Sequence, residues 1–218
     1  PYQYYLINGI FYFKKKLKKE KNIFQGFKYI FLDKQFLFIK KENNKKFKIL
    51  VTTGGTDNKN ITYKIYDCLK KIPNLFFYII IGPGFKKNNP VLNIKNKNVF
   101  FVKNKINLKP YFAKTDLSIT AGGISMFESI CSKNFTLVTE LYENQKYSIK
   151  KLKELNMISI IGKNTLIYKK KLIQNVKNVI KLKNNNRIKY PKNFNLIDGK
   201  SILRIENIIF KIINKKLN

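Results

Sequence analysis

Two pairs of glycines stand where this chain is best suited to hold a phosphate group. Gly122 and Gly123 lie within the stretch 115–128, which has the pattern of a short buried strand, a turn and the start of a helix. Gly54 and Gly55 end a second predicted strand. Glycine lets the backbone approach a ligand, and the N-terminus of a following helix offers unpaired N–H groups to an anion. Both turns therefore suit phosphate, although each also fits a plain strand-to-helix turn.

A hydroxyl, a carboxylate and two amides follow the second glycine pair. Glu128 lies one turn into the predicted helix, where an acidic side chain can accept hydrogen bonds from ribose hydroxyls. Ser125 and Glu128 also have the S-x-x-E spacing of a capping box, in which the glutamate bonds back to the serine N–H. Asn144 and Gln145 belong to a polar loop that suits either a ligand or the cap of the next helix. Spacing alone leaves both alternatives open in each case.

From about residue 46 onward the chain alternates predicted strands with predicted helices. Strands are expected at 48–53, 75–81, 98–102, 135–139 and 157–161 and within 115–128, with helices near 61–72, 108–113, 149–155 and 166–182 and from 198 onward. In the last helix we expect Ile202, Ile205, Ile209 and Ile212 to face the core. This alternation predicts an α/β fold with a doubly wound, mostly parallel sheet. Such sheets bind ligands at the carboxyl ends of their strands, where both glycine pairs fall.

Residues 1–45 have a different character from the rest. The run Lys14–Lys21 is highly charged and is expected to be exposed, whereas residues 22–40 are rich in aromatic side chains. We interpret 1–45 as the remnant of a preceding domain with its connector, and 46–218 as a second domain. The chain begins without Met or a secretory signal pattern, so an upstream N-terminal domain is expected to be missing from it.

The formal net charge of +33 raises nucleic acid or an anionic membrane as a partner. Only Arg187 and Arg204 are arginines, the residue favoured for bidentate phosphate and base contacts. Lysines run along almost the whole chain, and Lys, Asn and Ile together form nearly half of it. A strongly A/T-biased genome accounts for this composition. We therefore favour a lysine-coated, solvated surface over one that binds nucleic acid specifically.

Other sequence features narrow the class of protein. No apolar run approaches the ~18 residues of a membrane span. Cys68 and Cys131 lie far apart within predicted helices and form no CxxC or metal-spaced set, so we expect reduced core thiols in a cytoplasmic protein. No Asp-rich cluster is present, and neither an obligatory metal nor a cofactor is expected. Asp57 and Asp116 are expected to support a helix start and a strand entry, and Asp198 a turn.

The ordered set Ile49–Asp57, Ala121–Glu128, Glu143–Gln145 and Asp198–Lys200 carries a family resemblance. It resembles the C-terminal, Rossmann-like half of nucleotide-sugar enzymes with the GT-B fold. The chain is most similar to the UDP-sugar hydrolases of pseudaminic acid biosynthesis and the spore-coat polysaccharide proteins, and more distantly to family 28 glycosyltransferases. The resemblance covers roughly residues 23–210, including the aromatic connector. Two positions depart from the pattern, which has proline at Asn134 and glycine at Ser201.

The resemblance implies that this half of the enzyme grips UDP while the sugar lies in a cleft between two domains. The implied diphosphate contacts are Gly122, Gly123 and Ser125. The implied ribose contact is Glu128, and the implied uracil contact is the backbone near Val102. Gly54, Gly55 and Thr56 are implied to line the phosphate and sugar side, and Asn144 and Gln145 to reach sugar hydroxyls.

The implied activity is hydrolysis of a UDP-activated deoxyamino sugar with release of UDP. The family's catalytic histidine belongs to its N-terminal domain, and this chain contains no histidine. The catalytic residue of this chain is therefore unknown. Glycosyl transfer from a UDP-sugar by the same fold is the first alternative. A non-catalytic nucleotide-binding module or a basic nucleic-acid binder is the second.

Overall fold

A computed structural model describes residues 5–9, 22–42, 45–103, 105, 107–187, 189–190 and 192–217, so the predicted exposed run Lys14–Lys21 lies outside the described residues. Seven strands form one sheet in the order β5-β4-β3-β6-β7-β8-β9. All neighbours are parallel except β8 and β9. The strands are β3 (Phe47–Thr52), β4 (Leu75–Ile81), β5 (Val99–Lys103), β6 (Leu117–Ala121), β7 (Phe135–Glu140), β8 (Ile158–Lys163) and β9 (Leu166–Ile167).

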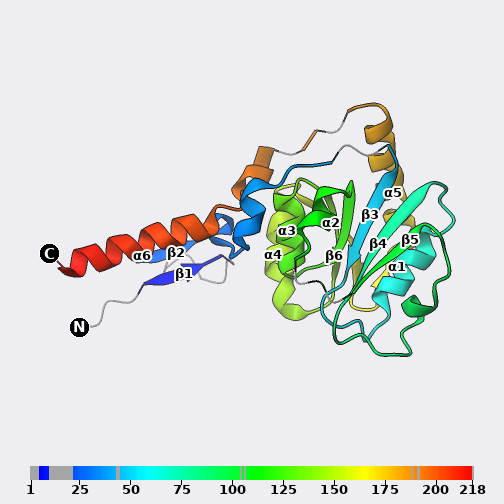
Figure 1. The fold of residues 1–218 in the computed structure, drawn as a ribbon, viewed down its shortest axis with the longest axis horizontal. Coiled ribbons are helices and arrows are strands. Elements are labelled where there is room, and N and C mark those ends of the chain that lie inside the picture. Colours follow the sequence, from blue (N-terminus) through cyan, green and yellow to red (C-terminus); the bar gives the residue numbers. More distant parts are fainter. Residues whose placement is uncertain are drawn as a thin grey trace.

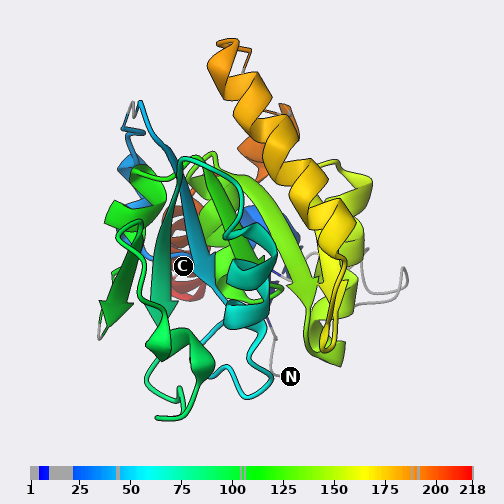
Figure 2. The same ribbon diagram turned by 90° about the vertical axis from the view of Figure 1, so that its right-hand side faces the viewer.

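Helices cover both faces of this sheet (Figures 1 and 2). One core cluster joins α1 and α5 to one face, and a second joins α2, α3 and α4 to the other. This arrangement confirms the predicted doubly wound, mostly parallel, Rossmann-like α/β fold. None of the helices in the described part of the chain has the length and apolarity needed to cross a membrane. The helices are α1 (Ile61–Leu69), α2 (Lys109–Ala113), α3 (Ile124–Cys131), α4 (Lys146–Glu154), α5 (Lys169–Asn184) and α6 (Ser201–Leu217).

The order of the strands creates a switch point between β3 and β6. From β3 the chain builds outward through β4 to β5, then returns to place β6 on the other side of β3. The loops that leave the carboxyl ends of β3 and β6 therefore run to opposite sides of the sheet. That divergence opens a crevice above two adjacent strands, which is where such sheets bind ligands.

The predicted helix 166–182 is wrong at its start. Leu166 and Ile167 form β9, an antiparallel hairpin strand in which Leu166 pairs with Lys163 and Ile167 with Gly162. Asn164 takes a left-handed conformation, with φ of 54°, in the tight turn between them. The helix α5 then starts only at Lys169. A short apolar pair next to a turn fits a strand as well as a helix, and pairing with β8 decides in favour of the strand.

Residues before β3 contribute to the second core cluster. The connector contains the short 3-10 helices η2 (Phe27–Tyr29) and η3 (Lys34–Phe38). Its side chains Phe27 and Phe36 lie against Phe127 and Phe112, with ring centroids 6.0 and 6.2 Å apart. A separate parallel pair, β1 (Leu6–Asn8) and β2 (Ile23–Gln25), lies alongside α6 (Figure 1). The remaining 3-10 helices are η4 (Pro90–Asn93), η5 (Glu143–Gln145) and η6 (Lys192–Leu196).

The last helix, α6, does not place all four predicted isoleucines in the core. Ile202, Ile205 and Ile212 are half-buried, but Ile209 is 47% exposed. The reason is visible in Figure 1, where α6 begins at the main body and extends away from it. Its start is fixed by the Asp198 turn: Asp198 accepts from the Lys200 N–H at 3.0 Å and from the Arg204 Nη1 at 2.8 Å. The Asp198 segment is therefore structural, as expected.

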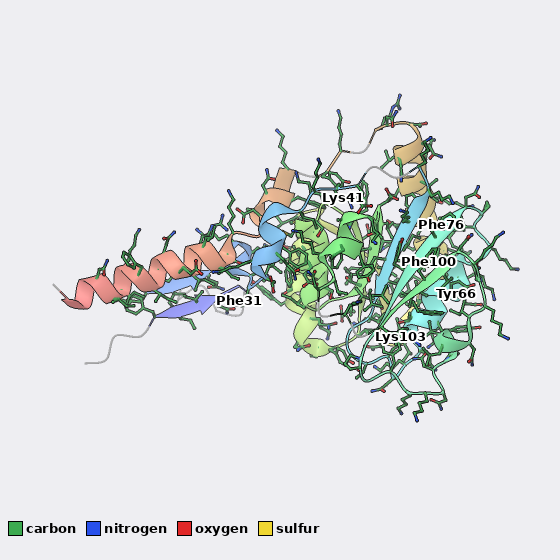
Figure 3. The ribbon with its side chains drawn as sticks, in the orientation of Figure 1. Phe31, Lys41, Tyr66, Phe76, Phe100 and Lys103 are labelled. Atoms are coloured by element: carbon green, nitrogen blue, oxygen red, sulfur yellow. The ribbon has the colours of Figure 1, made fainter. Side chains whose placement is uncertain are left out.

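Lys41 anchors the connector to the amino ends of the strands (Figure 3). Its Nζ donates to the carbonyl oxygens of Phe112, at 3.0 Å, and Thr115, and to Oδ1 of Asn134. Burial lowers the pKa of Lys41 to about 8, while the carboxylate of Asp116 opposes this shift. Asn134 is thus the acceptor that joins the connector to the loop before β7.

Replacing Lys41 with methionine is expected to lower the free energy of unfolding by about 2 kcal/mol at pH 7, because three part-buried acceptors lose a charged donor and only the carbonyl oxygen of Phe112 keeps another, Nδ2 of Asn134. In the wild type the folded-state pKa lies below the unfolded value of 10.5, so the unfolded chain binds more protons between pH 8 and 10.5. Wild-type stability should therefore rise with pH across that window, and the variant should lack this rise. Urea unfolding at pH 7 and pH 10 measures both effects. The exposed Lys40→Met variant is the control, and an equal pH response in all three proteins would contradict the assignment.

Candidate functional site

Three loops that carry predicted site residues meet at the carboxyl edge of the sheet. Gly54 follows β3, Gly122 follows β6, and Asn144 follows β7. These strands are consecutive neighbours, since Thr52 pairs with Thr120 and Ala121 with Thr139. The sheet therefore brings together glycine pairs that are far apart in sequence, at the switch point between β3 and β6.

Open space lies beside three of the four glycines. Within the described part of the chain, a Cβ atom built on Gly54, Gly55 or Gly123 would meet no atom within 4 Å apart from those of the adjacent residues. Gly54 still requires glycine because its φ is 108°. Gly123 has φ of −89° and ψ of −159°, which any residue can adopt. Neither crowding nor backbone conformation demands glycine at Gly55 or Gly123. A ligand that lies against the backbone there would explain both residues.

Gly122 differs from its neighbour because α4 packs directly onto it. A Cβ atom there would lie 2.5 Å from Cδ1 of Ile149 and 2.9 Å from Cβ of Gln145. The residue therefore sets how closely the loop after β7 can approach the loop after β6. This role is structural and independent of any ligand.

The Gly122→Ala variant is expected to lose about 1–3 kcal/mol of folding free energy, the usual effect of overpacking a close contact. Gly123→Ala should change stability by less than about 0.5 kcal/mol, because the added methyl group enters open space. Thermal unfolding of the two variants beside the wild type measures the contrast. Equal losses of folding free energy in the two variants would show that the packing around Gly122 does not distinguish it from Gly123.

A further loop, which sequence analysis did not assign to the site, supports the first glycine pair. A Cβ atom on Gly82, which follows β4, would lie 2.4 Å from the carbonyl oxygen of Gly55. The N–H of Gly84 donates to that same oxygen at 2.9 Å. A Cβ on Gly84 would also meet the side chain of Thr56. The sequence signal for this role is Gly-Pro-Gly at the end of a strand. The loop that these residues form holds Gly55 and Thr56 in place.

The helix α3 opens at the second glycine pair. Its N-cap residue is Gly123, no side chain caps it, and its first helical residue is Ile124. The alternative of a capping box built on Ser125 is therefore wrong. The first N–H groups of a helix have no acceptor within the helix and carry the positive end of its dipole. Those groups face the carboxyl edge of the sheet and suit an anion there.

Glu128 and Ser125 form a hydrogen-bonded pair within α3. Burial raises the pKa of Glu128 to about 7, with a further upward contribution from the carboxylate of Asp33, whereas the hydrogen bond from Ser125 opposes the rise. Glu128 therefore changes charge near neutral pH. A half-buried carboxyl group of this kind can accept hydrogen bonds from hydroxyls when ionised, and a bound ligand that supplies them would favour ionisation.

The loop after β7 presents amides to the same region. Oε1 of Gln145 accepts from the N–H groups of Leu141 and Tyr142, at 3.2 and 3.3 Å. Its amide oxygen is therefore committed to holding the loop, and its Nε2 group is the part left to act as a donor. Asn144 is exposed at the tip of the loop. Both residues line the same pocket as Gly122 and Gly123.

This pocket has a volume of about 540 Å³ and is lined from two sides. One side consists of the loops after β6 and β7. The other comes from β1, the connector and α6, through Ile7, Tyr29, Phe31 and Ile205. Figure 3 shows Phe31 next to the end of β1, where α6 leaves the body. None of the described residues that line the pocket is charged, so it suits a neutral group with both apolar and hydrogen-bonding parts, such as a sugar.

The other predicted residues do not line this pocket, among them Gly54, Gly55, Thr56, Ser125 and Glu128. Val102 is in the edge strand β5 with its side chain in the second core cluster, so only its backbone is available to a ligand. Asp57 accepts from the N–H groups of Ile61 and Thr62, at 2.7 and 3.1 Å, and supports the start of α1 as expected. Asp116 accepts from the N–H of Lys48 at 2.9 Å and fixes the entry of β6.

Comparison with known proteins gives related sequences of modest identity, and no family model matches the chain. An uncharacterized protein of Methanocaldococcus jannaschii is 32% identical over 49% of the chain. The spore coat polysaccharide biosynthesis protein SpsG of Bacillus subtilis is 24% identical over 86% of it. A Helicobacter pylori protein, pseudaminic acid cytidylyltransferase and UDP-2,4-diacetamido-2,4,6-trideoxy-beta-L-altropyranose hydrolase, is 24% identical over 69%. The chain spans 25%, 58% and 28% of these three relatives respectively.

Solved structures share the fold. The MurG protein of Acinetobacter baumannii superposes with a TM-score of 0.59 at 15% identity, covering 81% of this chain and 55% of that one. The C-terminal domain of a group 1 glycosyl transferase, LpcC of Francisella tularensis, has a TM-score of 0.50 at 12% identity, covering 79% of this chain and 97% of that domain. The chain therefore has the Rossmann-like fold of one domain of GT-B glycosyltransferases.

Proposed function

We propose that this chain binds the UDP part of a UDP-sugar and takes part in its hydrolysis, with a deoxyamino sugar of the pseudaminic acid type as substrate. The observation that carries the proposal is the open space beside Gly55 and Gly123 at the switch point of the sheet. None of the described residues crowds these two positions, and neither backbone conformation requires glycine. A diphosphate against the backbone does require it, and the N-terminus of α3 supplies donors to the same place.

Each predicted residue has a part in this proposal. Gly122, Gly123 and Ser125 meet the diphosphate through backbone N–H groups and the serine hydroxyl. Glu128 accepts hydrogen bonds from the ribose, and the backbone at Val102 meets the uracil. The remaining contacts belong to the sugar and its phosphate: Gly54, Gly55 and Thr56 on one side, Asn144 and Gln145 on the other.

The mechanism requires a nucleophilic water and a stabilised leaving group. Water adds to the sugar while UDP departs, and the departing diphosphate gains negative charge. The helix dipole and N–H groups of α3 are oriented to stabilise that charge before the reaction starts. The hydrolases that the chain resembles use a histidine of their other domain, and this chain contains none, so we propose that the base that activates water comes from a further domain.

Glycosyl transfer is the second candidate, with an acceptor hydroxyl in place of water. The observation that favours it is the shared fold with MurG and the other glycosyltransferases. The site described above would serve both reactions, since they share the nucleotide and the leaving group. A nucleotide-binding module without catalysis is a third possibility, because the catalytic base is not assigned within the chain.

Calorimetric titration with UDP, ADP and a short duplex DNA at physiological salt tests the proposal. We expect UDP to bind more tightly than ADP, and DNA binding to weaken steeply as salt rises, because unspecific lysine contacts release counterions. Absence of UDP binding would contradict the proposed site. DNA affinity above that for UDP at physiological salt would assign the chain to nucleic acid instead.

A further inference from the structure

One end of the main sheet carries a cluster of aromatic side chains. Tyr78 of β4 pairs with Phe100 of the edge strand β5, and their rings stack with centroids 5.3 Å apart and 23° between the ring planes. Tyr111 of α2 lies against Tyr78, with ring centroids 5.9 Å apart. Phe76 lies two residues before Tyr78 on β4, so its side chain leaves the same face of the sheet. We refer to these four residues as the ring cluster.

The ring cluster is open to solvent, although strands of parallel sheets are normally covered on both faces. Phe100 is 44% exposed, and the other three rings are half-buried. The helices α3 and α4 pack against β6, β7 and β8, whereas β4 and β5 form the other end of the sheet. Figure 3 shows Phe76 and Phe100 over β4 and β5, at the end of the molecule away from α6. A flat ligand can therefore reach the rings, and Phe100 most easily.

Two lysines lie directly over these rings. Nζ of Lys46 is 4.6 Å from the ring centroid of Phe76. Nζ of Lys114 is 5.3 Å from the ring centroid of Tyr78 and 5.0 Å from that of Tyr111. An ammonium group is attracted to the negative face of an aromatic ring, so the ring cluster holds cations at its own surface. Such contacts are weak at an exposed site, and the ammonium groups can turn toward a stronger anion.

The surroundings of the ring cluster are positive on balance. Lys46 is exposed, and so is Lys103 at the end of β5. Glu42 of the connector opposes them with one carboxylate, since its N–H donates to the carbonyl oxygen of Ala113, next to Lys114. Exposed rings bordered by more cations than anions suit a ligand that carries flat groups along a chain of negative charges. Single-stranded nucleic acid has this chemistry.

We propose that the ring cluster binds single-stranded nucleic acid, with bases stacked on its rings and phosphates paired with Lys46 and Lys114. Phe100 is the main stacking residue, because it is the most exposed of the four rings. Aromatic side chains on the face of a sheet stack two or three bases in a common RNA-binding fold. Every base has an aromatic face, so such stacking tolerates different sequences. The proposal does not depend on the proposed function, because no residue of the ring cluster lines the candidate pocket.

Two other occupants fit this surface less well. A second copy of the chain would bring the same lysines of both molecules together, because a two-fold interface uses one patch twice. Duplex nucleic acid offers phosphates to the lysines, but its bases are stacked on one another and cannot reach Phe100. The scarcity of arginine agrees with binding that does not read sequence, since arginine makes the commonest specific contact to guanine. The rings, rather than the lysines spread along the whole chain, distinguish this surface.

Fluorescence anisotropy with a labelled oligothymidylate at physiological salt tests the proposal. Phe100→Ala should weaken binding about tenfold, as expected for the loss of one stacked base, while the net charge stays the same. Phe100→Tyr, which keeps a ring, should retain the affinity. Phe210→Ala, which removes a 65% exposed ring from α6, should leave it unchanged. An abasic oligomer of equal length should bind the wild type about tenfold more weakly than oligothymidylate does, and Phe100→Ala should not weaken it further.

The two lysines should act through the salt dependence of binding. Replacing Lys46 or Lys114 with glutamine should reduce the slope of log affinity against log salt by about 0.7 for each phosphate contact that is lost. Phe100→Ala should leave this slope unchanged, because stacking releases no counterions. The exposed Lys150→Gln variant on α4 removes the same charge at a distance from the ring cluster and is the matched control.

Equal binding of the two oligomers by the wild type, or an unchanged affinity of Phe100→Ala, would overturn the proposal and reduce the binding to unspecific lysine contacts. Displacement of oligothymidylate by UDP would assign Phe100 to the nucleotide site instead. Tighter binding of polygalacturonate, with the same loss in Phe100→Ala, would assign the surface to an acidic glycan. Thermal unfolding shows whether Phe100→Ala folds, and Phe100→Leu, which keeps apolar bulk without a ring, should show the same loss. UDP titration is scored separately, so failure of either proposal leaves the other standing.

Discussion

The Gly123→Asp variant is expected to bind UDP at least a hundredfold more weakly than the wild type, with an unchanged melting temperature. The added side chain enters open space, and the backbone conformation at Gly123 accepts any residue. Its carboxylate would lie where we place the diphosphate. Two unit charges about 5 Å apart at an effective dielectric constant near 20 repel by about 3 kcal/mol, which corresponds to that loss of affinity.

Calorimetry with UDP and thermal unfolding together measure this result. Leu166→Asp provides the matched control, because it adds the same charge to an exposed position of the hairpin after β8. In a chain of net charge +33 one further carboxylate hardly alters the overall field, so a loss confined to Gly123→Asp must be local. Unaltered UDP binding by Gly123→Asp would refute the site assignment.

The backbone conformations of this chain strengthen the argument from its glycines. Several left-handed positions, where glycine is common, are occupied by asparagine, which tolerates them better than most residues. This use fits a composition rich in Asn and poor in Gly. Glycine at Gly55 and Gly123, where no such conformation exists, is then harder to ascribe to the backbone alone. The asparagines in left-handed conformation are Asn60, Asn74, Asn156, Asn164 and Asn186.

Much of the main sheet followed from the sequence. Continuous apolar runs such as Leu75–Ile81 can be buried on both faces only in a parallel sheet with helices on each side, and β4 has these bounds. The hairpin at Leu166 was missed because two apolar residues before a basic helix fit the helical period as well. The exposure of Ile209 was missed because periodicity identifies an apolar face without saying what covers it.

The sequence predicted only part of the candidate site, because local signals identify one wall of the pocket and not the other. Strand ends and glycine pairs are local signals, and parallel topology brings the loops after β3, β6 and β7 to one edge. The second wall of the pocket has no such signal. Ile7, Tyr29 and Ile205 come from β1, the connector and α6, and no spacing relates them. Their meeting depends on how the connector packs over α3.

The Glu128→Gln variant is expected to be more stable than the wild type at pH 8, yet to bind UDP about tenfold more weakly. The folded-state pKa of about 7 exceeds the ordinary value of 4.5, so the folded protein binds more protons between these values. Wild-type stability should therefore fall as pH rises from about 4.5 to 7, by up to about 3 kcal/mol. The neutral amide avoids this cost of burying charge, but it is a weaker acceptor for ribose hydroxyls.

The same reasoning gives a pH dependence of binding. Hydroxyls that donate to Glu128 favour its ionised form, so the UDP affinity of the wild type should rise between pH 6 and 8 more steeply than that of Glu128→Gln, which keeps only the pH dependence of the UDP phosphate itself. Titrations at three pH values, with urea unfolding of the same proteins, measure both properties. Glu154→Gln, which alters an exposed carboxylate of α4 paired with Lys151, should change neither. If Glu128→Gln gains stability and keeps full UDP affinity, Glu128 is a buried carboxyl group that takes no part in binding. A ribose contact at this position requires the opposite result, in which the gain in stability is accompanied by a loss of UDP affinity.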